Sequence, residues 1–520
     1  MFTRILSAVA ALFVLLLALA ATPAEARWLR AESPRFIIYS DGSESVLRAY
    51  VDKMEVFDTF LRARHGLPEN GVPLRKLPIY LVRSRTDLQI TWNGAGDAVA
   101  GYYSPGSGDT FAVVTLEDRK DSTVLMHEYT HHFMLQNFPG AYPAWMVEGY
   151  AEFYGETKVN DRFIEVGQVA NHRADALLAG RWMPMADLLG NKRTSTDWNS
   201  FYGQSWILTH YLMSDPARFT QFRTYASAVG RGADPVKAME AATGQSPEAL
   251  EQTLRKYVRS GLKITQYKRG NIPQPQITVT TLPPSADDLL LQRIQIVAHS
   301  YKDADPGYLA MIRKRAAKYP DDQLAVLTLG QTEMELGDHA AGRSLLEGWL
   351  RTHPDDAEAM FVLGSHLYND AWSKSDEAAD KKDAAGKKGD DDEDVDEEPV
   401  ERTVADPEMM KDAERWLAKA VELAPTDYRI LYAYAQTRRQ SGGYPQKSDL
   451  DLLIRAYKQA PQVVPLRFEL IQVLIVQNHT PEARALLQPL LNSPHGGSVV
   501  AAAQRLLQRI EDQERRKGAG

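Results

Sequence analysis

A repeat with a period of 34 residues in the second half of the chain most limits what this sequence can fold into. The triplet Pro-Asp-Asp at 320–322 returns at 354–356, and the pair Leu-Gly at 329–330 returns at 363–364. A period of this length is typical of stacked helix pairs, because each pair buries its apolar face only against its neighbours. We therefore expect an all-α helical-repeat solenoid over residues 286–513.

This half of the sequence resembles the tetratricopeptide (TPR) family. Small residues stand where the two helices of a unit must approach closely, and a proline follows the second helix. In the first clear unit these residues are Gly330, Gly337 and Pro354. The next unit opens at Gly364, but residues with the spacing of its second helix come only at 413–425. The resemblance implies a surface that binds a protein partner or the substrate.

An acidic stretch at about 371–406 explains the delay, and we place it in the turn between these two helices. From Lys374 to Arg402 it contains thirteen acidic and six basic residues. Such self-repelling charge cannot pack a core, so a disordered loop is expected. The net charge of the whole chain is −8, which leaves −1 for the remainder. A near-neutral surface does not favour a nucleic-acid partner, which would need a basic face.

Residues 1–26 have the features of a secretory signal peptide. Arg4 precedes an apolar run at 5–20, and residues 24–26 fit a small-x-small cleavage site. A retained membrane anchor is the alternative, but the run is shorter than the roughly 20 residues that span a bilayer. The chain has no cysteine and no later apolar run of spanning length. We expect a bacterial periplasmic or secreted protein with no membrane span after cleavage.

The order of elements in residues 27–268 indicates an α+β domain, because strands come first and helices follow. Short β-type runs at 35–39 and 76–82 precede a hairpin pattern at 100–114. From about residue 122 onward the pattern is mainly helical. A proline-rich stretch at 269–285 then predicts an extended linker to the repeats.

A metal site is indicated by His127, Glu128 and His131. Two histidines four residues apart share one face of a helix, so both imidazoles can reach one metal ion. Glu128 follows the first histidine and would act as general base toward a water at the metal. The five-residue pattern alone is only moderately specific, because incidental histidines on a helix also produce it.

A third ligand stands in the next helical segment. A catalytic zinc takes three protein ligands and keeps one position open. Glu148 lies seventeen residues after His131, beyond a turn-rich stretch at 137–143 that lets a second helix fold back beside the first. Glu152 is one helical turn further on, where it would hydrogen-bond a ligand histidine.

With these residues the segment resembles the gluzincin metallopeptidases of the MA clan, in which HExxH is followed by a helix with the pattern W-x-x-E-G-x-A. Four positions match this second pattern: Trp145, Glu148, Gly149 and Ala151. The resemblance implies a zincin-like metallopeptidase fold. It also implies a Zn²⁺ ion held by His127, His131 and Glu148, with Glu128 as the catalytic base.

Three further expectations come from the same resemblance. Tyr202 would donate a hydrogen bond to the oxyanion, although a packed core tyrosine fits this position equally well. Residues 111–116 stand in the right order for an edge strand that binds substrate backbone. The sequence has no G-x-M-E-N motif, which holds the free amino end of the substrate in aminopeptidases. Endopeptidase action is therefore favoured. His132 and His210 are expected to be structural.

The sequence leaves three functions open. The main prediction is an exported zinc peptidase whose repeats recruit a protein partner or the peptide substrate. The alternative is a non-catalytic envelope scaffold, in which a structural zinc only holds the domain together. Glu128 argues against the scaffold, because a structural site has no use for a base beside an open position. Zinc-dependent hydrolysis of a non-peptide amide or ester is the third function.

Overall fold

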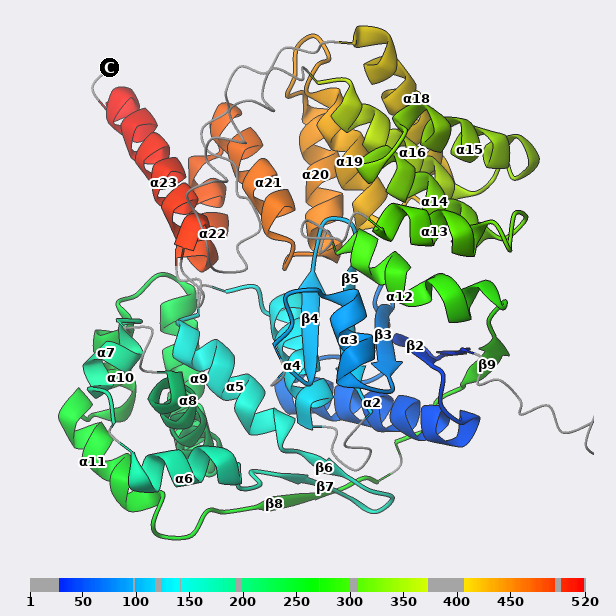
Figure 1. The fold of residues 1–520 in the computed structure, drawn as a ribbon. Coiled ribbons are helices and arrows are strands. Elements are labelled where there is room, and N and C mark those ends of the chain that lie inside the picture. The colour runs from blue at the N-terminus through cyan, green and yellow to red at the C-terminus, as the bar shows by residue number, and fades with distance from the viewer. Residues whose placement is uncertain are drawn as a thin grey trace, which may run out of the picture.

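The computed structural model describes residues 28–96, 99–116, 123–140, 142–180, 182–192, 198–270, 272–298, 307–372, 406–491 and 497–518. A part built on β-sheets lies on one side, and a stack of helices lies on the other (Figure 1). The predicted signal peptide at 1–26 and residues 373–405 of the acidic insertion lie outside the described ranges. Within those ranges, no helix combines the length and apolar character needed to cross a membrane.

Six strands form the main sheet in the order β4-β5-β3-β2-β1-β9. They are β1 (Leu29–Glu32), β2 (Phe36–Ser40), β3 (Leu77–Val82), β4 (Gly101–Pro105), β5 (Thr110–Thr115) and β9 (Thr278–Thr281). The pairs β2·β3 and β3·β5 are parallel, and the other pairs are antiparallel. Strands β3 and β5 carry nearly continuous apolar runs, as expected of parallel strands that are buried on both faces.

The edge of this sheet differs from the prediction. Residues 111–116, predicted as the edge strand, belong mostly to β5, which lies between β4 and β3. The edge strand is β4, paired antiparallel to β5 with Tyr103 opposite Ala112. Every residue of β5 is buried and every residue of β4 is half-buried, which is the burial that interior and edge positions impose. The predicted hairpin itself is confirmed.

The predicted linker at 269–285 is also wrong in part, because it contains β9. This strand pairs with β1, with Leu29 opposite Thr281. The preceding segment joins a second sheet of β6 (Lys158–Val159), β7 (Phe163–Val166) and β8 (Thr265–Lys268). The chain thus returns to the sheet domain before the repeats begin. The β-branched run Thr-Val-Thr-Thr favours a strand, but its partner lies about 250 residues earlier in the sequence.

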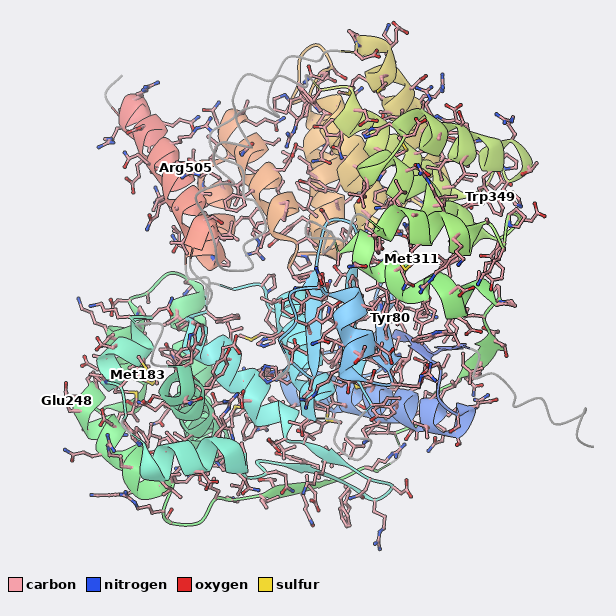
Figure 2. The ribbon with its side chains drawn as sticks, in the orientation of Figure 1. Tyr80, Met183, Glu248, Met311, Trp349 and Arg505 are labelled. Carbon is pink, nitrogen blue, oxygen red and sulfur yellow. The ribbon has the colours of Figure 1, made fainter. Side chains whose placement is uncertain are left out.

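Helices cover both faces of the main sheet. The N-terminal part contains α2 (Glu44–His65), α3 (Arg85–Thr91), α4 (Thr123–Asn137), α5 (Ala144–Gly155), α6 (Asn171–Ala179), α7 (Met185–Leu189), α8 (Trp198–Met213), α9 (Pro216–Gly230), α10 (Pro235–Thr243) and α11 (Pro247–Tyr257). One large core joins the sheet to α2, α4, α5 and α8. A smaller core on the other face joins Phe111 and Val113 to α3 and to Leu290 of the first repeat-side helix. Tyr80 of β3 packs against this second core (Figure 2).

The C-terminal part is a stack of helix pairs, as the period of 34 residues predicted. Its helices are α12 (Ser285–Val297), α13 (Tyr308–Ala316), α14 (Gln323–Leu336), α15 (His339–Thr352), α16 (Ala357–Asp370), α18 (Pro407–Leu423), α19 (Tyr428–Arg438), α20 (Lys447–Gln459), α21 (Val464–Val476), α22 (Thr480–Leu491) and α23 (Gly497–Gly518). A Cβ atom added at Gly330 would lie 2.8 Å from Leu346, and one at Gly364 would lie 2.6 Å from Leu417. Glycines one period apart therefore make equivalent close contacts, which confirms the helical repeat.

The acidic insertion interrupts one helix pair without separating its helices. Helices α16 and α18 pack against each other. The N–H of Asp406 donates to the carbonyl of Ala371 at 3.1 Å, so the two ends of the insertion meet. The insertion therefore occupies the position of a turn within one repeat, as predicted.

Candidate metal centre

Three side chains from α4 and α5 converge as the sequence predicted: His127, His131 and Glu148. The two histidine Nε2 atoms are 3.1 Å apart. Glu148 Oε2 lies 3.5 Å from Nε2 of His131 and 3.8 Å from Nε2 of His127. Bonds of about 2.1 Å in a tetrahedral zinc site separate two ligand atoms by about 3.4 Å. The three distances lie on both sides of this value, so these residues fit a zinc ion.

The packing of α4 and α5 fixes the relative positions of the ligands. Tyr129 of α4 is buried against Phe36 of β2 and Phe57 of α2, and Phe133 of α4 packs against His65 of α2. Helix α5 is buried along its entire length and lies between α4 and α8. The histidine side chains remain partly accessible, with 19% exposure for His127 and 15% for His131. A packed core therefore supports the helix face that carries His127 and His131.

Glu128 follows His127 on α4, beside the face that carries the two histidines. Burial raises the pKa of Glu128 to about 7 in the metal-free protein, although His131 opposes the shift. A carboxylate with such a pKa can both accept and return a proton near neutral pH, which is the property that general acid–base catalysis needs.

The two ligand histidines have different charge states in the metal-free protein. Burial and the neighbouring His131 lower the pKa of His127 to about 4. Burial also acts to lower the pKa of His131. The charge of Glu148 outweighs this effect, so the pKa of His131 is raised to about 9. The pair therefore shares one proton, held toward Glu148. A divalent cation needs both imidazoles neutral, so its binding would release this proton.

Glu152 has a different partner from the one predicted. Its Oε1 lies 3.8 Å from Nδ1 of His127, which is too long for a hydrogen bond. Its carboxylate instead accepts two hydrogen bonds from Arg173 of α6, at 2.7 and 3.0 Å. Glu152 is therefore a carboxylate that lies next to His127 and is paired with Arg173.

Tyr202 lies on α8 and contacts Arg173, the arginine that pairs with Glu152. The Arg173 guanidinium lies 4.7 Å from the centre of the Tyr202 ring, and Trp198 stacks on the ring at 6.0 Å. The tyrosine is half-buried. Its assignment as oxyanion donor stays a prediction, since these contacts orient the ring and leave the role of the hydroxyl open.

His132 and His210 have structural partners, as expected. His132 Nδ1 lies 3.0 Å from the Tyr103 hydroxyl. His210 lies between the carbonyl of Gly167 at 3.0 Å and the hydroxyl of Tyr257 at 2.9 Å. Tyr103 is the residue that sequence reasoning missed, although it lies in the predicted hairpin. Only the identity of the edge strand would have pointed to it.

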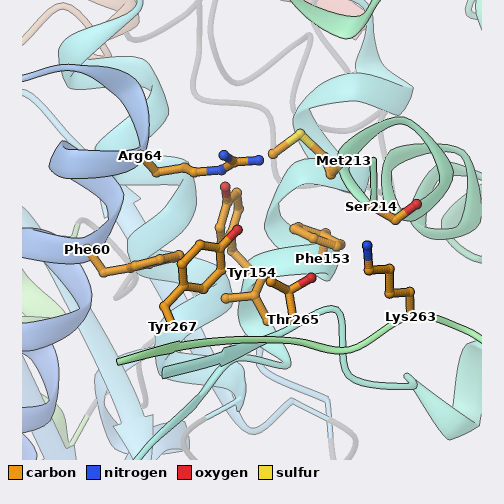
Figure 3. Close-up of a pocket in the computed structure, with 10 residues that line it drawn as sticks. Phe60, Arg64, Phe153, Tyr154, Met213, Ser214, Lys263, Thr265 and Tyr267 are labelled. Carbon is orange, nitrogen blue, oxygen red and sulfur yellow. The ribbon is translucent and has the colours of Figure 1, made fainter. Parts of the chain in front are cut away.

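Two cavities lie away from the metal ligands. The smaller one, about 10 Å³, has room for roughly one water molecule. It lies where Phe153 and Tyr154 of α5 meet Tyr267 of β8 (Figure 3). The larger one, about 440 Å³, is lined mainly by aromatic and methionine side chains of α2, α4, α5 and α9. Neither is lined by His127, His131 or Glu148.

The comparisons with known proteins found only weak structural similarity. No protein-family model matches the chain, and no curated protein matches it. Among solved structures, it is similar to TTC0263, a thermophilic TPR protein of Thermus thermophilus. The TM-score is 0.30 at 15% identity, over 43% of this chain and 99% of that chain. For the MamA RS-1 ArsTM double mutant the TM-score is 0.25 at 13% identity, over 46% and 100%. The helical-repeat assignment therefore depends on the helix pairs described above.

Proposed function

We propose that this protein is an exported zinc-dependent peptidase with a gluzincin-type site. The observation that carries the proposal is the convergence of His127, His131 and Glu148 at distances suited to one tetrahedral ion, with Glu128 beside them. Two histidines, one glutamate and an open fourth position are a ligand set of catalytic zinc sites. Zinc bound there would polarise a carbonyl group and lower the pKa of a water molecule.

Glu128 carries the proton transfers in this proposal. Its carboxylate takes a proton from the attacking water and then returns it to the nitrogen of the leaving amine. In the described sheet β4 has a neighbouring strand only on its β5 side, so we place the backbone of an extended peptide on its other edge, which favours peptides over compact substrates. Without a G-x-M-E-N motif we favour endopeptidase action.

Cleavage of an unstructured protein tests the proposal. Purified wild-type protein is expected to contain about one zinc per chain, given the three ligands, and to cleave casein. Glu128→Gln is expected to keep the metal and lose the cleavage, because only the base is removed. A wild-type protein that holds zinc but cleaves no substrate would sink the proposal. A product from a non-peptide amide or ester would replace it with the third function.

A non-catalytic scaffold is the second candidate, favoured by the helix pairs of α14 to α22, an architecture that presents extended binding surfaces. In that case the repeats would bind a protein partner and zinc would only stabilise the sheet domain. Equal rescue of a deletion strain by wild type and Glu128→Gln would support the scaffold. Rescue by wild type alone would support the peptidase.

A further inference from the structure

The larger cavity has the size and the lining of a small-molecule site. Its volume of about 440 Å³ lies within the roughly 300 to 1,000 Å³ that is usual for such sites. Protein interiors are close-packed, so a void of this size between helices is unusual unless a molecule fills it. The buried part of its lining is apolar or aromatic and consists of Met134, Met146, Tyr150 and Phe222. This lining favours the apolar part of a ligand.

Two arginine side chains give the cavity a positive charge. Arg64 of α2 (Figure 3) and Arg223 of α9 both line it. Within the described part of the chain neither arginine forms an ion pair, and the described lining contains no carboxylate. The Arg64 guanidinium stacks on the ring of Phe219 at 4.1 Å. Because the N–H groups of a guanidinium lie in its plane, this stacking leaves them available to an anion.

A histidine in the same lining adds no negative charge and no competing ligand group. Nε2 of His65 contacts the Tyr150 hydroxyl, so these two polar groups satisfy each other. Burial lowers the pKa of His65 to about 4, and the positive charges of Arg64 and Arg223 add to the shift. His65 is therefore neutral near pH 7, and the charge beside the apolar lining is that of the two guanidiniums.

We propose that this cavity binds a fatty acid of medium chain length, with its acyl chain among the methionine and aromatic side chains and its carboxylate at Arg64 and Arg223. A guanidinium presents paired N–H groups that match the two oxygens of a carboxylate. Methionine side chains adapt their shape to a flexible chain. A neutral apolar molecule would leave both positive charges without a counter-ion. The cavity is not lined by the metal ligands, so this inference does not depend on the peptidase proposal.

Calorimetric titration of the full-length protein with decanoate tests the site. Decanoate is expected to bind once per chain, and decanol, which has the same chain without the charge, about tenfold more weakly. Arg64→Gln and Arg223→Gln should each weaken decanoate binding about fivefold and leave decanol binding unchanged, because only a contact to the carboxylate is lost. Ala226 of α9 also lines the cavity. Ala226→Phe should weaken both ligands by about tenfold or more, because the added ring occupies their space.

Arg218→Gln is the matched control for the loss of one positive charge. Arg218 lies on α9 as Arg223 does, but it stacks on the ring of Tyr211 at 4.3 Å and does not line the cavity. This variant should bind decanoate as the wild type does. Failure of the wild type to bind decanoate, or equal affinity for decanoate and decanol, would overturn the inference. So would wild-type decanoate affinity in all three cavity variants, because the ligand would then lie elsewhere, for example at the metal.

Discussion

Gly149 should be required for the metal centre, although it binds no metal. It lies next to Glu148 at the contact between α5 and α8. A Cβ atom built there would lie 2.3 Å from the carbonyl oxygen of Ser205 and 2.5 Å from Oγ1 of Thr209. Ordinary contact begins at 3.4 Å, so the two helices would have to separate by about 1.1 Å. Ser205 presents backbone here, which cannot rotate away.

The cost of Gly149→Ala follows from two opposed effects. Overpacking a core costs about 1 to 3 kcal/mol, and the shift of more than 1 Å between two backbones places this case at the upper end. Alanine recovers about 1 kcal/mol through its better helix propensity. We expect a net loss of about 2 kcal/mol in the free energy of unfolding. Since Glu148 moves with α5, zinc affinity should fall about tenfold or more.

Urea unfolding of the metal-free protein and competition with a zinc chelator measure these two effects. Gly348→Ala on α15 is the control, because its Cβ would meet only the end of the Arg351 side chain, at 3.4 Å. That variant should be up to about 1 kcal/mol more stable than wild type, with unchanged zinc affinity. If Gly149→Ala were as stable as wild type and bound zinc equally well, the close approach of α5 to α8 would be refuted.

Two further predictions concern buried charges. Arg173→Met removes the two hydrogen bonds that the Arg173 guanidinium donates to Glu152, a carboxylate at 6% side-chain exposure, so we expect a loss of about 3 kcal/mol in urea unfolding and weaker zinc binding by chelator competition; unchanged values would contradict the pairing. Burial acts to raise the pKa of Asp427, but Arg429 and Arg75 outweigh it and hold the pKa at about 2, below the ordinary 3.8. The charge therefore contributes about 2 kcal/mol above pH 4, which is lost as the pH falls toward 2. Asp427→Asn should lack this part of the acid sensitivity, measured as the difference in unfolding free energy between pH 5 and pH 3; equal differences in both proteins would contradict it.

The convergence of His127, His131 and Glu148 was predictable because its geometry is local. His127 and His131 share a helix face through their spacing alone, and a short turn returns the chain for Glu148. Gly149 entered the prediction only as a match to the motif, and the close approach of α5 to α8 that requires it is seen only in the structure. The helix pairs of the repeats were predictable for the same reason: their contacts join residues close in sequence, such as Gly330 and Leu346.

The sequence does not determine which strands and helices become neighbours when they lie far apart along the chain. Strand order placed β4 at the edge instead of residues 111–116, and it brought β9 from the predicted linker beside β1. Arg173 as the partner of Glu152 depends on how α6 packs beside α5 and α8. The hydrogen bond from the Tyr428 hydroxyl to the Gly106 carbonyl joins residues 322 positions apart, and no periodicity or motif carries that information.

The anomalous scattering of zinc in crystals of the metal-loaded protein tests the central claim most directly. We predict one strong zinc peak about 2.0 to 2.2 Å from Nε2 of His127, Nε2 of His131 and a carboxylate oxygen of Glu148, with no protein atom in the fourth position. A peak without Glu148 among its ligands would contradict the account. So would a peak closed by a fourth protein side chain, because that is the geometry of a structural site.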